Sequence, residues 1–352
     1  MTRATLLCSI AVAFAACGGG DRSARKGPQR AGSATVGSAA LTGAGATFPA
    51  PLYTKWFDAY ARETGVRINY QSIGSGGGIR QFTEGTVDFG ASDAPMTDQQ
   101  VAAVKGNVRH IPTVLGAVVA TYNLPSAGQS PLRFDGPTLA DIFLGRITRW
   151  SDRRIAALNP GVKLADRDII VVHRSDGSGT SFVFTDYLSK VSNEWKRRVG
   201  RATSVDWPSG LGGKGNEGVT QQVKQTEAAI GYVELIYAIS NGLPAASIKN
   251  ADGAFVEPTL KSVSAAAAGA PLGPESDFRV SITNPSGRDS YPISSFTWLL
   301  VKEEGADSSK AAALHRFLLW MLQPPAQRMA ADLHYAPLPV PVIELLQRRL
   351  GA

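Results

Sequence analysis

The sequence is short of cysteine and histidine: its 352 residues include two Cys and four His. Cys8 lies in an N-terminal segment that has the features of an export signal, so a mature exported chain would keep only Cys17. A single cysteine cannot form an intrachain disulfide, and the histidines have no close spacing to one another or to cysteine. These shortages argue against a disulfide-stabilised scaffold and against a zinc site.

Charged residues are also few, at 18% of the chain, and the net charge of +7 is unevenly distributed. Arg3 contributes one unit and residues 17–40 contribute three, which leaves +3 for residues 41–352. That remainder is weakly basic and has no cluster of Lys and Arg with interleaved aromatic residues, so no nucleic-acid partner is expected.

Hydrophobic runs long enough to span a bilayer are missing. The apolar run 6–16 is too short to cross a membrane, but it follows Arg3 and fits the apolar part of a signal peptide. Small residues precede Cys17, as at a bacterial lipoprotein cleavage site. We therefore interpret residues 1–16 as a signal peptide and residues 17–40 as a lipidated Cys17 followed by a flexible linker rich in Gly, Ala and Ser. This predicts an exported periplasmic or cell-surface lipoprotein; an ordinary secretory signal is the alternative.

From Leu41 onward, β-branched or aromatic segments alternate with helical patterns, and 43% hydrophobic residues can fill a large core. The expected strands cover residues 66–70, 87–91, 111–122 and 169–173. Helices are expected where apolar residues share a helical face (Leu52, Trp56 and Tyr60; Leu139, Ile142 and Phe143) and after Ser178, Glu217 and Ser308. The alternation predicts an α/β fold of mainly parallel sheets flanked by helices, and the length predicts about two domains.

Three loops between expected strands and helices are rich in Gly, Ser and Thr: residues 42–48, 74–78 and 176–181. In parallel sheets, ligands bind at the carboxyl ends of the strands, where such loops lie. Glycine lets backbone N–H groups approach a ligand, hydroxyls add short donors, and a helix N-terminus carries partial positive charge. Together with Arg174, these loops favour a site for a small oxyanion.

The motifs of common nucleotide-binding and hydrolytic enzymes are missing from these loops. Gly213-Lys214 is followed by Gly215 instead of Ser or Thr, which excludes a Walker loop, and the Rossmann pattern lacks its third glycine. Neither Ser75 nor Ser178 has the flanking glycines of a nucleophile elbow. We therefore expect neither an enzymatic activity nor a cofactor.

Six segments share one order and spacing with a known family. They are TGAGATFPAP (42–51), IGSGGG (73–78), VDFGASDAP (87–95), DGSGTSFVFT (176–185), WPSGLGGKGN (207–216) and AIGYVE (229–234). This set resembles PstS, the family of phosphate-binding proteins of the bacterial high-affinity phosphate ABC importer, from about residue 41 to 335. The resemblance implies a two-lobed periplasmic-binding-protein fold of type 2 topology that encloses inorganic phosphate between its lobes and catalyses no reaction.

The resemblance also implies which residues bind phosphate. The family's contacts fall on Thr47, Phe48, Ser75, Asp93, Arg174, Ser178, Gly179 and Thr180. Phe48 and Gly179 would donate through backbone N–H groups and the hydroxyls through O–H, each neutral bond contributing about 0.5 to 1.5 kcal/mol. The guanidinium fork of Arg174 would grip two oxygens for roughly 1.5 to 3 kcal/mol, with Asp176 as its orienting partner.

Asp93 is unusual in such a set because a carboxylate should repel an anion. We expect an ionised Asp93 to accept a hydrogen bond from a protonated phosphate oxygen. Sulfate has no such proton at neutral pH, and a site built around one specific hydrogen bond can reject the analogue that lacks it by roughly 10⁴ to 10⁵. The alternative is that Asp93 caps the N-terminus of a following helix.

In the implied fold the chain crosses between the lobes twice, and we expect these crossings near Pro112 and Asp289. Lobe 1 would then comprise residues 41–112 and 290–352, and lobe 2 residues 113–289. The predicted contacts lie on both lobes, so phosphate would favour closure. The resemblance further implies that the closed protein docks on the permease subunits of the importer, and we expect a monomer.

Two other functions are left open by the residues. The first is a binder of another tetrahedral oxyanion, such as sulfate or molybdate, in the same fold; Asp93 disfavours it. The second is a secreted phosphatase, which needs a metal cluster or an activated nucleophile that the sequence does not display.

Overall fold

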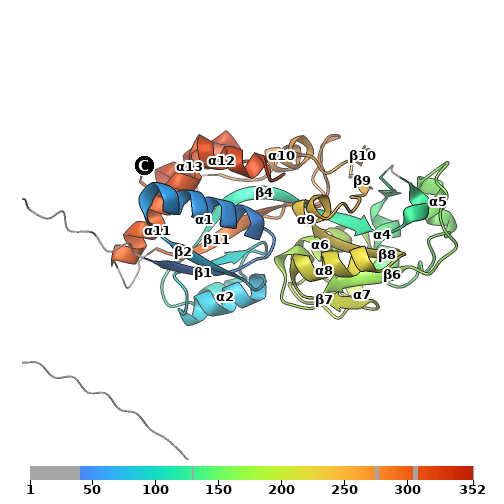
Figure 1. Cartoon of the computed structure of the whole chain (residues 1–352), viewed down its shortest axis with the longest axis horizontal. Coiled ribbons are helices and arrows are strands. Elements are labelled where there is room, and N and C mark those ends of the chain that lie inside the picture. Colours follow the sequence, from blue (N-terminus) through green and yellow to red (C-terminus); the bar gives the residue numbers. More distant parts are fainter. Residues whose placement is uncertain (1–39, 129–130, 274–276, 304–307, 352) are drawn as a thin grey trace, which may run out of the picture. The chain divides into compact units, whose positions relative to one another are not determined.

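A mixed β-sheet is the central feature of the computed structural model (Figure 1). The structure describes residues 40–128, 131–273, 277–303 and 308–351, and within these ranges the sheet has eight strands. In sheet order they are β2 (Ile68–Ser72), β1 (Leu41–Gly45), β3 (Phe89–Ser92), β11 (Ser294–Lys302), β4 (Val108–Tyr122), β8 (Ala229–Glu234), β6 (Ile170–Arg174) and β7 (Leu211–Gly213). The signal peptide, Cys17 and the linker up to residue 39 lie outside the described residues.

The sheet consists of two parallel halves joined by two antiparallel strands. Strands β2, β1 and β3 are parallel to one another, as are β8, β6 and β7. Between them, β11 and β4 pair antiparallel with each other and with their outer neighbours. The prediction of an α/β fold with a mainly parallel sheet on each side is therefore confirmed. A small separate sheet consists of β10 (Phe255–Val256), β9 (Ser247–Lys249) and β5 (Arg133–Phe134).

Strand β4 connects the two halves because it changes partner along its length. It pairs with β11 from Val108 to Ala117 and with β8 from Val118 to Tyr122. The crossing expected near Pro112 thus falls inside a continuous strand. Pro112 has no N–H to donate to a ladder, and the register of β4 against β11 shifts next to it.

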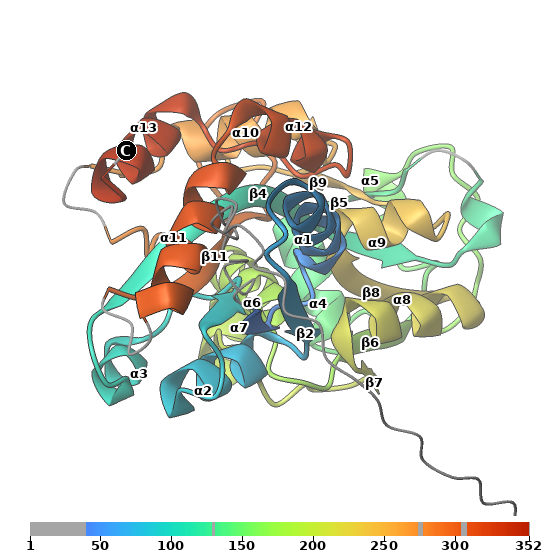
Figure 2. The same ribbon diagram turned by 60° about the vertical axis from the view of Figure 1, so that its left-hand side comes forward.

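Helices flank both halves of the sheet (Figures 1 and 2). Around β1 to β3 and β11 lie α1 (Ala50–Thr64), α2 (Ser75–Glu84), α3 (Asp98–Ala103), α11 (Ser308–Met321), α12 (Pro324–Ala331) and α13 (Val340–Arg349). Around β6 to β8 lie α4 (Gly136–Phe143), α5 (Arg153–Leu158), α6 (Gly179–Val191), α7 (Asn193–Arg198), α8 (Gly215–Gln225) and α9 (Leu235–Ser240). The remaining helices are η1, a 3₁₀ turn (Pro125–Ala127), and α10 (Leu260–Ala268), which contacts β4 and β11.

The helices predicted from apolar spacing form, and they bury the predicted faces. Leu52, Trp56 and Tyr60 are buried on α1, which begins with a proline in its first turn. Residues 139, 142 and 143 are buried on α4, and α6, α8 and α11 begin within two residues of the expected positions. Burial of these faces against the sheet supplies the main favourable term of folding.

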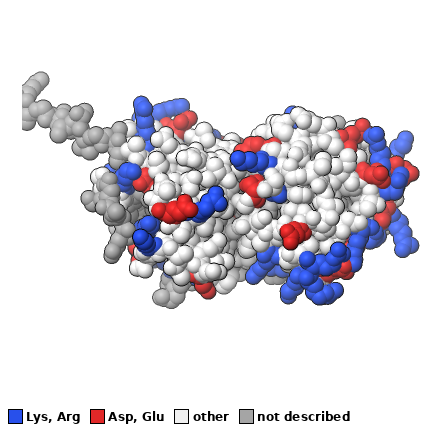
Figure 3. Space-filling view, turned by 90° about the horizontal axis from the view of Figure 1, so that it is seen from below, with Lys and Arg blue, Asp and Glu red and all other residues white. Residues whose placement is uncertain are grey.

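Charged residues are unevenly distributed over the surface. On the face seen in Figure 3, Lys and Arg gather most densely over the half that carries α5 to α8. Lys196, Arg197 and Arg198 on α7 are exposed. Most of the remaining surface in that view is uncharged. Across the described ranges, no helix combines the length and the apolar composition that a membrane crossing requires.

Candidate functional site

The eight predicted contact residues come together at the carboxyl ends of four strands, β1, β2, β3 and β6. Thr47 and Phe48 follow β1, Asp93 follows β3, and Arg174 is the last residue of β6. Ser75 begins α2, and Ser178, Gly179 and Thr180 form the N-terminus of α6, where Ser178 Oγ caps the helix by accepting from the N–H of Ser181 at 3.0 Å. All eight are buried, including the charged Asp93 and Arg174 at 1% and 3% exposure. The sheet topology explains this convergence because the two parallel halves direct these strand ends toward one another.

Ser75 is the point where the two Gly-rich loops meet. Its Oγ accepts the backbone N–H groups of Gly179 at 3.0 Å and of Asp93 at 3.2 Å. Close by, the N–H of Gly76 donates to the carbonyl of Gly177 at 2.9 Å. A Cβ on Gly179 would stand 2.5 Å from both Ser75 Oγ and Asp93 Oδ2. This approach therefore requires glycine for steric reasons.

Arg174 is held in a fixed orientation by Asp176. Its Nε and Nη2 donate to the two carboxylate oxygens of Asp176 at 2.8 and 2.6 Å, and its Nη1 donates to Thr180 Oγ1 at 3.3 Å. Burial raises the pKa of Asp176, but the hydrogen bonds and charge of Arg174, with the N–H of Gly215, outweigh burial and lower it overall. Arg174 is thus a buried, preorganised cation whose bidentate partner leaves Nη1 directed at the hydroxyl of Thr180.

Asp93 is a buried carboxyl whose two oxygens both have hydroxyl partners. Oδ1 accepts from Thr297 Oγ1 at 2.8 Å, and Oδ2 lies 3.5 Å from Ser75 Oγ. Burial raises the pKa of Asp93 to about 7 against the opposing effects of Thr297, Arg174 and Ser75. The alternative role as a helix cap is wrong: the next helix, α3, begins at Asp98 and is capped by Thr97.

The partner of Asp93, Thr297, was not predicted from the sequence. It lies on β11 beside the register shift against β4, where Thr113 Oγ1 donates to the carbonyl of Thr297 at 3.3 Å. Bulges redirect side chains, and this one accompanies a threonine that reaches the loop after β3. No local pattern marks Thr297, because it is one of four polar residues in a strand of nine.

Asn216 and Tyr237 were also missed. Asn216, at the start of α8, donates from Nδ2 to Thr47 Oγ1 at 2.8 Å and to Thr180 Oγ1 at 3.2 Å. The hydroxyl of Tyr237 donates to the carbonyl of Thr47 at 2.5 Å. Asn216 is the last residue of the segment 207–216, which carried part of the family resemblance, so the sequence did contain a signal for it. No motif in the sequence marks Tyr237.

The arrangement is suited to binding a compact anion. It combines one buried cation, short hydroxyl donors and helix N-termini with a carboxyl group that titrates near neutrality. His173, the basic residue beside Arg174, is engaged elsewhere: its ring stacks on Trp207 at 5.0 Å and its Nδ1 lies 3.0 Å from the carbonyl of Arg174. Within the ranges that the structure describes, no three His, Cys, Asp or Glu side chains are grouped as ligands for a metal ion.

Known proteins resemble this chain over most of its length. A family model described as the PBP superfamily domain matches residues 28–325. The phosphate-binding protein PstS of Xylella fastidiosa is 42% identical over 351 residues, which cover 97% of this chain and 96% of that protein. The protein of the same name from Pasteurella multocida is 45% identical over 313 residues, 89% of this chain and 90% of its own. The solved structure of a phosphate binding protein from Stenotrophomonas maltophilia shares the fold, with a TM-score of 0.68 at 21% identity over 88% of this chain and 94% of that one.

Proposed function

Because the chain belongs to the PstS family of phosphate-binding proteins within the PBP superfamily, we propose that it binds inorganic phosphate outside the cytoplasm by lobe closure and delivers it to an ABC transporter permease for import. The expected two-lobed binding-protein fold is confirmed by this membership together with the sheet order.

The observation that carries the proposal is the buried Arg174 among donors from both halves of the sheet. Arg174 and Thr180 come from the β6 to α6 side, while Thr47 and Ser75 come from the loops after β1 and β2. The bidentate ion pair with Asp176 compensates the buried guanidinium of Arg174 and fixes its orientation. Further donors at the same place match the oxygens of a tetrahedral anion. We assign phosphate contacts to Thr47, Phe48, Ser75, Asp93, Arg174, Ser178, Gly179 and Thr180.

Asp93 would make the site selective for phosphate. Its carboxylate accepts a hydrogen bond from a protonated phosphate oxygen, whereas sulfate would place unprotonated oxygens against a buried negative charge. Sulfate and molybdate binding are the alternatives that the same fold could support.

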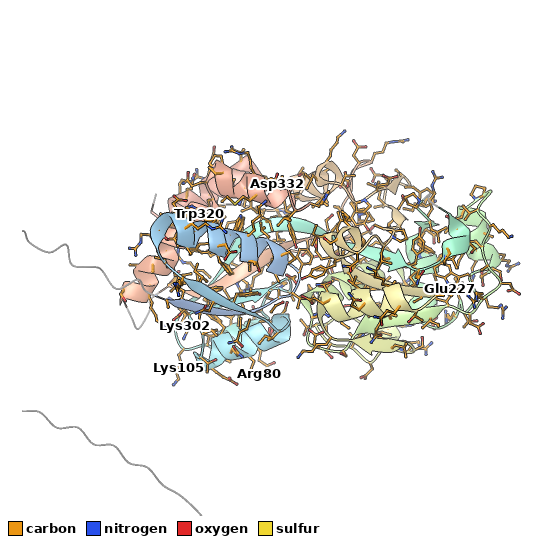
Figure 4. All side chains as sticks on the ribbon, viewed as in Figure 1. Arg80, Lys105, Glu227, Lys302, Trp320 and Asp332 are labelled. Carbon is orange, nitrogen blue, oxygen red and sulfur yellow. The ribbon has the colours of Figure 1, made fainter. Side chains whose placement is uncertain are left out.

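Calorimetric titration of the ion-free protein with phosphate, sulfate and molybdate tests both the binding of phosphate and the selectivity for it. We expect tight phosphate binding and discrimination against sulfate by roughly 10⁴ or more. Asp93→Asn should weaken phosphate and strengthen sulfate. Asp332→Asn changes an exposed carboxyl at the end of α12 (Figure 4) and should alter neither. An Asp93→Asn variant with unchanged preference would remove Asp93 from the selectivity argument.

Closure would bring together lobe 1 (41–112 and 290–352) and lobe 2 (113–289). Support comes from hydrogen bonds that join residues of the two segments, such as Asn216 with Thr47 and Gly179 with Ser75. Ligand contacts on both lobes favour the closed state only because the open state lacks some of them. Small-angle scattering should show compaction on adding phosphate; an unchanged radius of gyration would argue against closure.

We further propose an exported, lipidated monomer that acts without catalysis. The apolar run 6–16 and the following Cys17 support a lipid anchor, with the permease as the membrane partner. Mass spectrometry of the mature protein should find a lipidated Cys17 at its N-terminus, and sedimentation should find one chain. Purified protein should not turn over a chromogenic phosphate ester; sustained hydrolysis would contradict the assignment as a binding protein.

A further inference from the structure

The orientation of the Asn216 side-chain amide is fixed by a backbone group. The N–H of Glu234, at the end of β8, lies 2.9 Å from Asn216 Oδ1. A backbone N–H can only donate, so the atom facing it must be the amide oxygen. The opposite atom is therefore Nδ2, an obligate donor with two hydrogens.

Both hydrogens of Nδ2 are used on threonine hydroxyls of the site. Nδ2 donates to Thr47 Oγ1 at 2.8 Å and to Thr180 Oγ1 at 3.2 Å. Each hydroxyl also receives a second donor: the backbone N–H of Asn216 at 3.2 Å for Thr47, and Arg174 Nη1 at 3.3 Å for Thr180. A hydroxyl oxygen accepts two hydrogen bonds, so both are saturated as acceptors and can act further only as donors.

Ser75 reaches the same condition by another route. Its Oγ accepts from the N–H groups of Gly179 and Asp93, which fills both acceptor positions. The hydroxyls of Thr47 and Thr180 are therefore donors toward a ligand, whereas the hydroxyl of Ser75 has Oδ2 of Asp93 as an acceptor at 3.5 Å. Among these groups the acceptor is the carboxyl of Asp93.

On the basis of the proposed function, we propose that Asn216 is a positioning residue that turns the hydroxyl protons of Thr47 and Thr180 toward phosphate and thereby steers the phosphate's own proton to Asp93. A protonated phosphate oxygen has no acceptor at either threonine, so the bound ion takes the one orientation that places P–OH at the carboxylate. Asn216 thus acts on selectivity through two other residues.

Asn216→Asp reverses this polarity with almost no change of shape. A carboxylate oxygen in place of Nδ2 accepts from both threonines, which withdraws their protons from the ligand and adds a buried negative charge. We expect phosphate affinity at pH 8 to fall roughly a hundredfold or more, from two lost hydrogen bonds and the repulsion.

The matched control is Asn159→Asp. Asn159 is also buried and has the same bonding pattern: Oδ1 accepts a backbone N–H, from Arg133, and Nδ2 donates to two oxygens, the carbonyls of Arg133 and Ile155. It lies outside the site, so this variant should lose stability and keep its phosphate affinity.

Lowering the pH distinguishes a role of Asn216 in positioning the hydroxyl protons from a role in stabilising the fold. In the Asn216→Asp variant, a protonated carboxyl group again carries a hydrogen that it can donate to one threonine. The affinity of this variant relative to the unaltered protein should therefore recover at least about tenfold between pH 8 and pH 5. The charged and titratable groups around this position are Arg174, Asp176, Glu217, Glu234 and Asp93. They are present in both proteins, and the variant is compared with the unaltered protein at the same pH.

Calorimetry with inorganic phosphate on the full mature chain measures these affinities, with circular dichroism as the folding control. Equal affinity of Asn216→Asp and Asn159→Asp, or a loss that is the same at pH 5 and pH 8, would overturn the proposal. If Asn216→Asp does not fold, Asn216→Ala replaces it, and unchanged affinity of that variant overturns it equally. Absence of phosphate binding by the unaltered protein would instead refute the proposed function.

Discussion

The backbone N–H of Gly179 donates to Oγ of Ser75 at 3.0 Å, although 104 residues separate them in the chain. This bond joins the N-terminus of α6 to the N-terminus of α2. The bond requires glycine at position 179, because a Cβ there would clash with both Ser75 and Asp93. Under the proposed function, lobe closure and phosphate contact would therefore depend on the same atoms.

Gly179→Ala should weaken phosphate binding by about ten- to a hundredfold. The added Cβ would stand 2.5 Å from two short, buried side chains that have little room to move, and overpacking of this kind costs about 1 to 3 kcal/mol. Calorimetry checks the affinity. Gly269→Ala is the control because a Cβ at Gly269 meets no atom within 4 Å. Equal affinities of the two variants would contradict the steric argument.

Arg174→Lys should reduce phosphate affinity by roughly ten- to over a hundredfold while the charge is kept. Lysine cannot form the fork that bonds both oxygens of Asp176 and also reaches Thr180, and a charge-assisted bond contributes about 1.5 to 3 kcal/mol. Arg80→Ala on α2 removes an exposed arginine (Figure 4) and should leave binding intact. If both variants bind equally well, the guanidinium geometry is not needed.

The ligand-free protein should lose stability through Asp93 as the pH rises from about 4 to 7. Burial raises the pKa of Asp93 from 3.8 to about 7 in the folded state, so the folded protein binds more protons than the unfolded chain in that window. The contribution of Asp93 to the free energy of unfolding is largest below pH 4 and is lost as the pH rises through 7. The total change in this contribution is on the order of 4 kcal/mol.

Urea unfolding of Asp93→Asn measures this contribution directly. The amide keeps an acceptor for Thr297 and does not ionise, so the variant should be about as stable as the unaltered protein near pH 4 and more stable at pH 8. If the difference in unfolding free energy between the variant and the unaltered protein does not change with pH, the pKa of Asp93 is not raised in the folded state.

Thr297→Val should raise the pKa of Asp93 further, because the lost hydroxyl bond stabilises the ionised carboxylate. Discrimination against sulfate requires that ionised form, so its onset should move to higher pH in the variant. The ratio of phosphate to sulfate affinity, measured from pH 5 to 9, gives the midpoint. Thr121→Val removes a buried hydroxyl bonded to the carbonyl of Pro244, away from the site, and should leave the midpoint in place.

Much of the architecture could be predicted because it depends on local patterns. The strand expected at 169–173 forms at Ile170–Arg174, and the helix expected on the face of Leu52, Trp56 and Tyr60 forms at Ala50–Thr64. Apolar periodicity sets these elements because each must bury one side against the sheet. The eight predicted contact positions came from the family resemblance: seven of them lie within its six short segments, and Arg174 lies two residues before the fourth segment.

Partners of the site residues were not predictable in the same way. Thr297 reaches Asp93 from a strand that is distant in sequence, through a register shift that no local pattern announces. The choice between helix cap and buried acceptor for Asp93 also required the structure, since Asp93-Ala94-Pro95 fits both. Hydrogen-bond partners are decided by which chain segments become neighbours.

The amino-acid order alone determined the alternation of strands and helices, the loops that supply N–H and hydroxyl donors, and the kinship that the motifs carry, because these depend on residues close together along the chain. The tertiary structure decided which donors face which acceptors. Asn216 becomes a common donor to Thr47 and Thr180, and Asp93 acquires its raised pKa, only when β4 joins the two halves of the sheet and excludes water from the place where they meet.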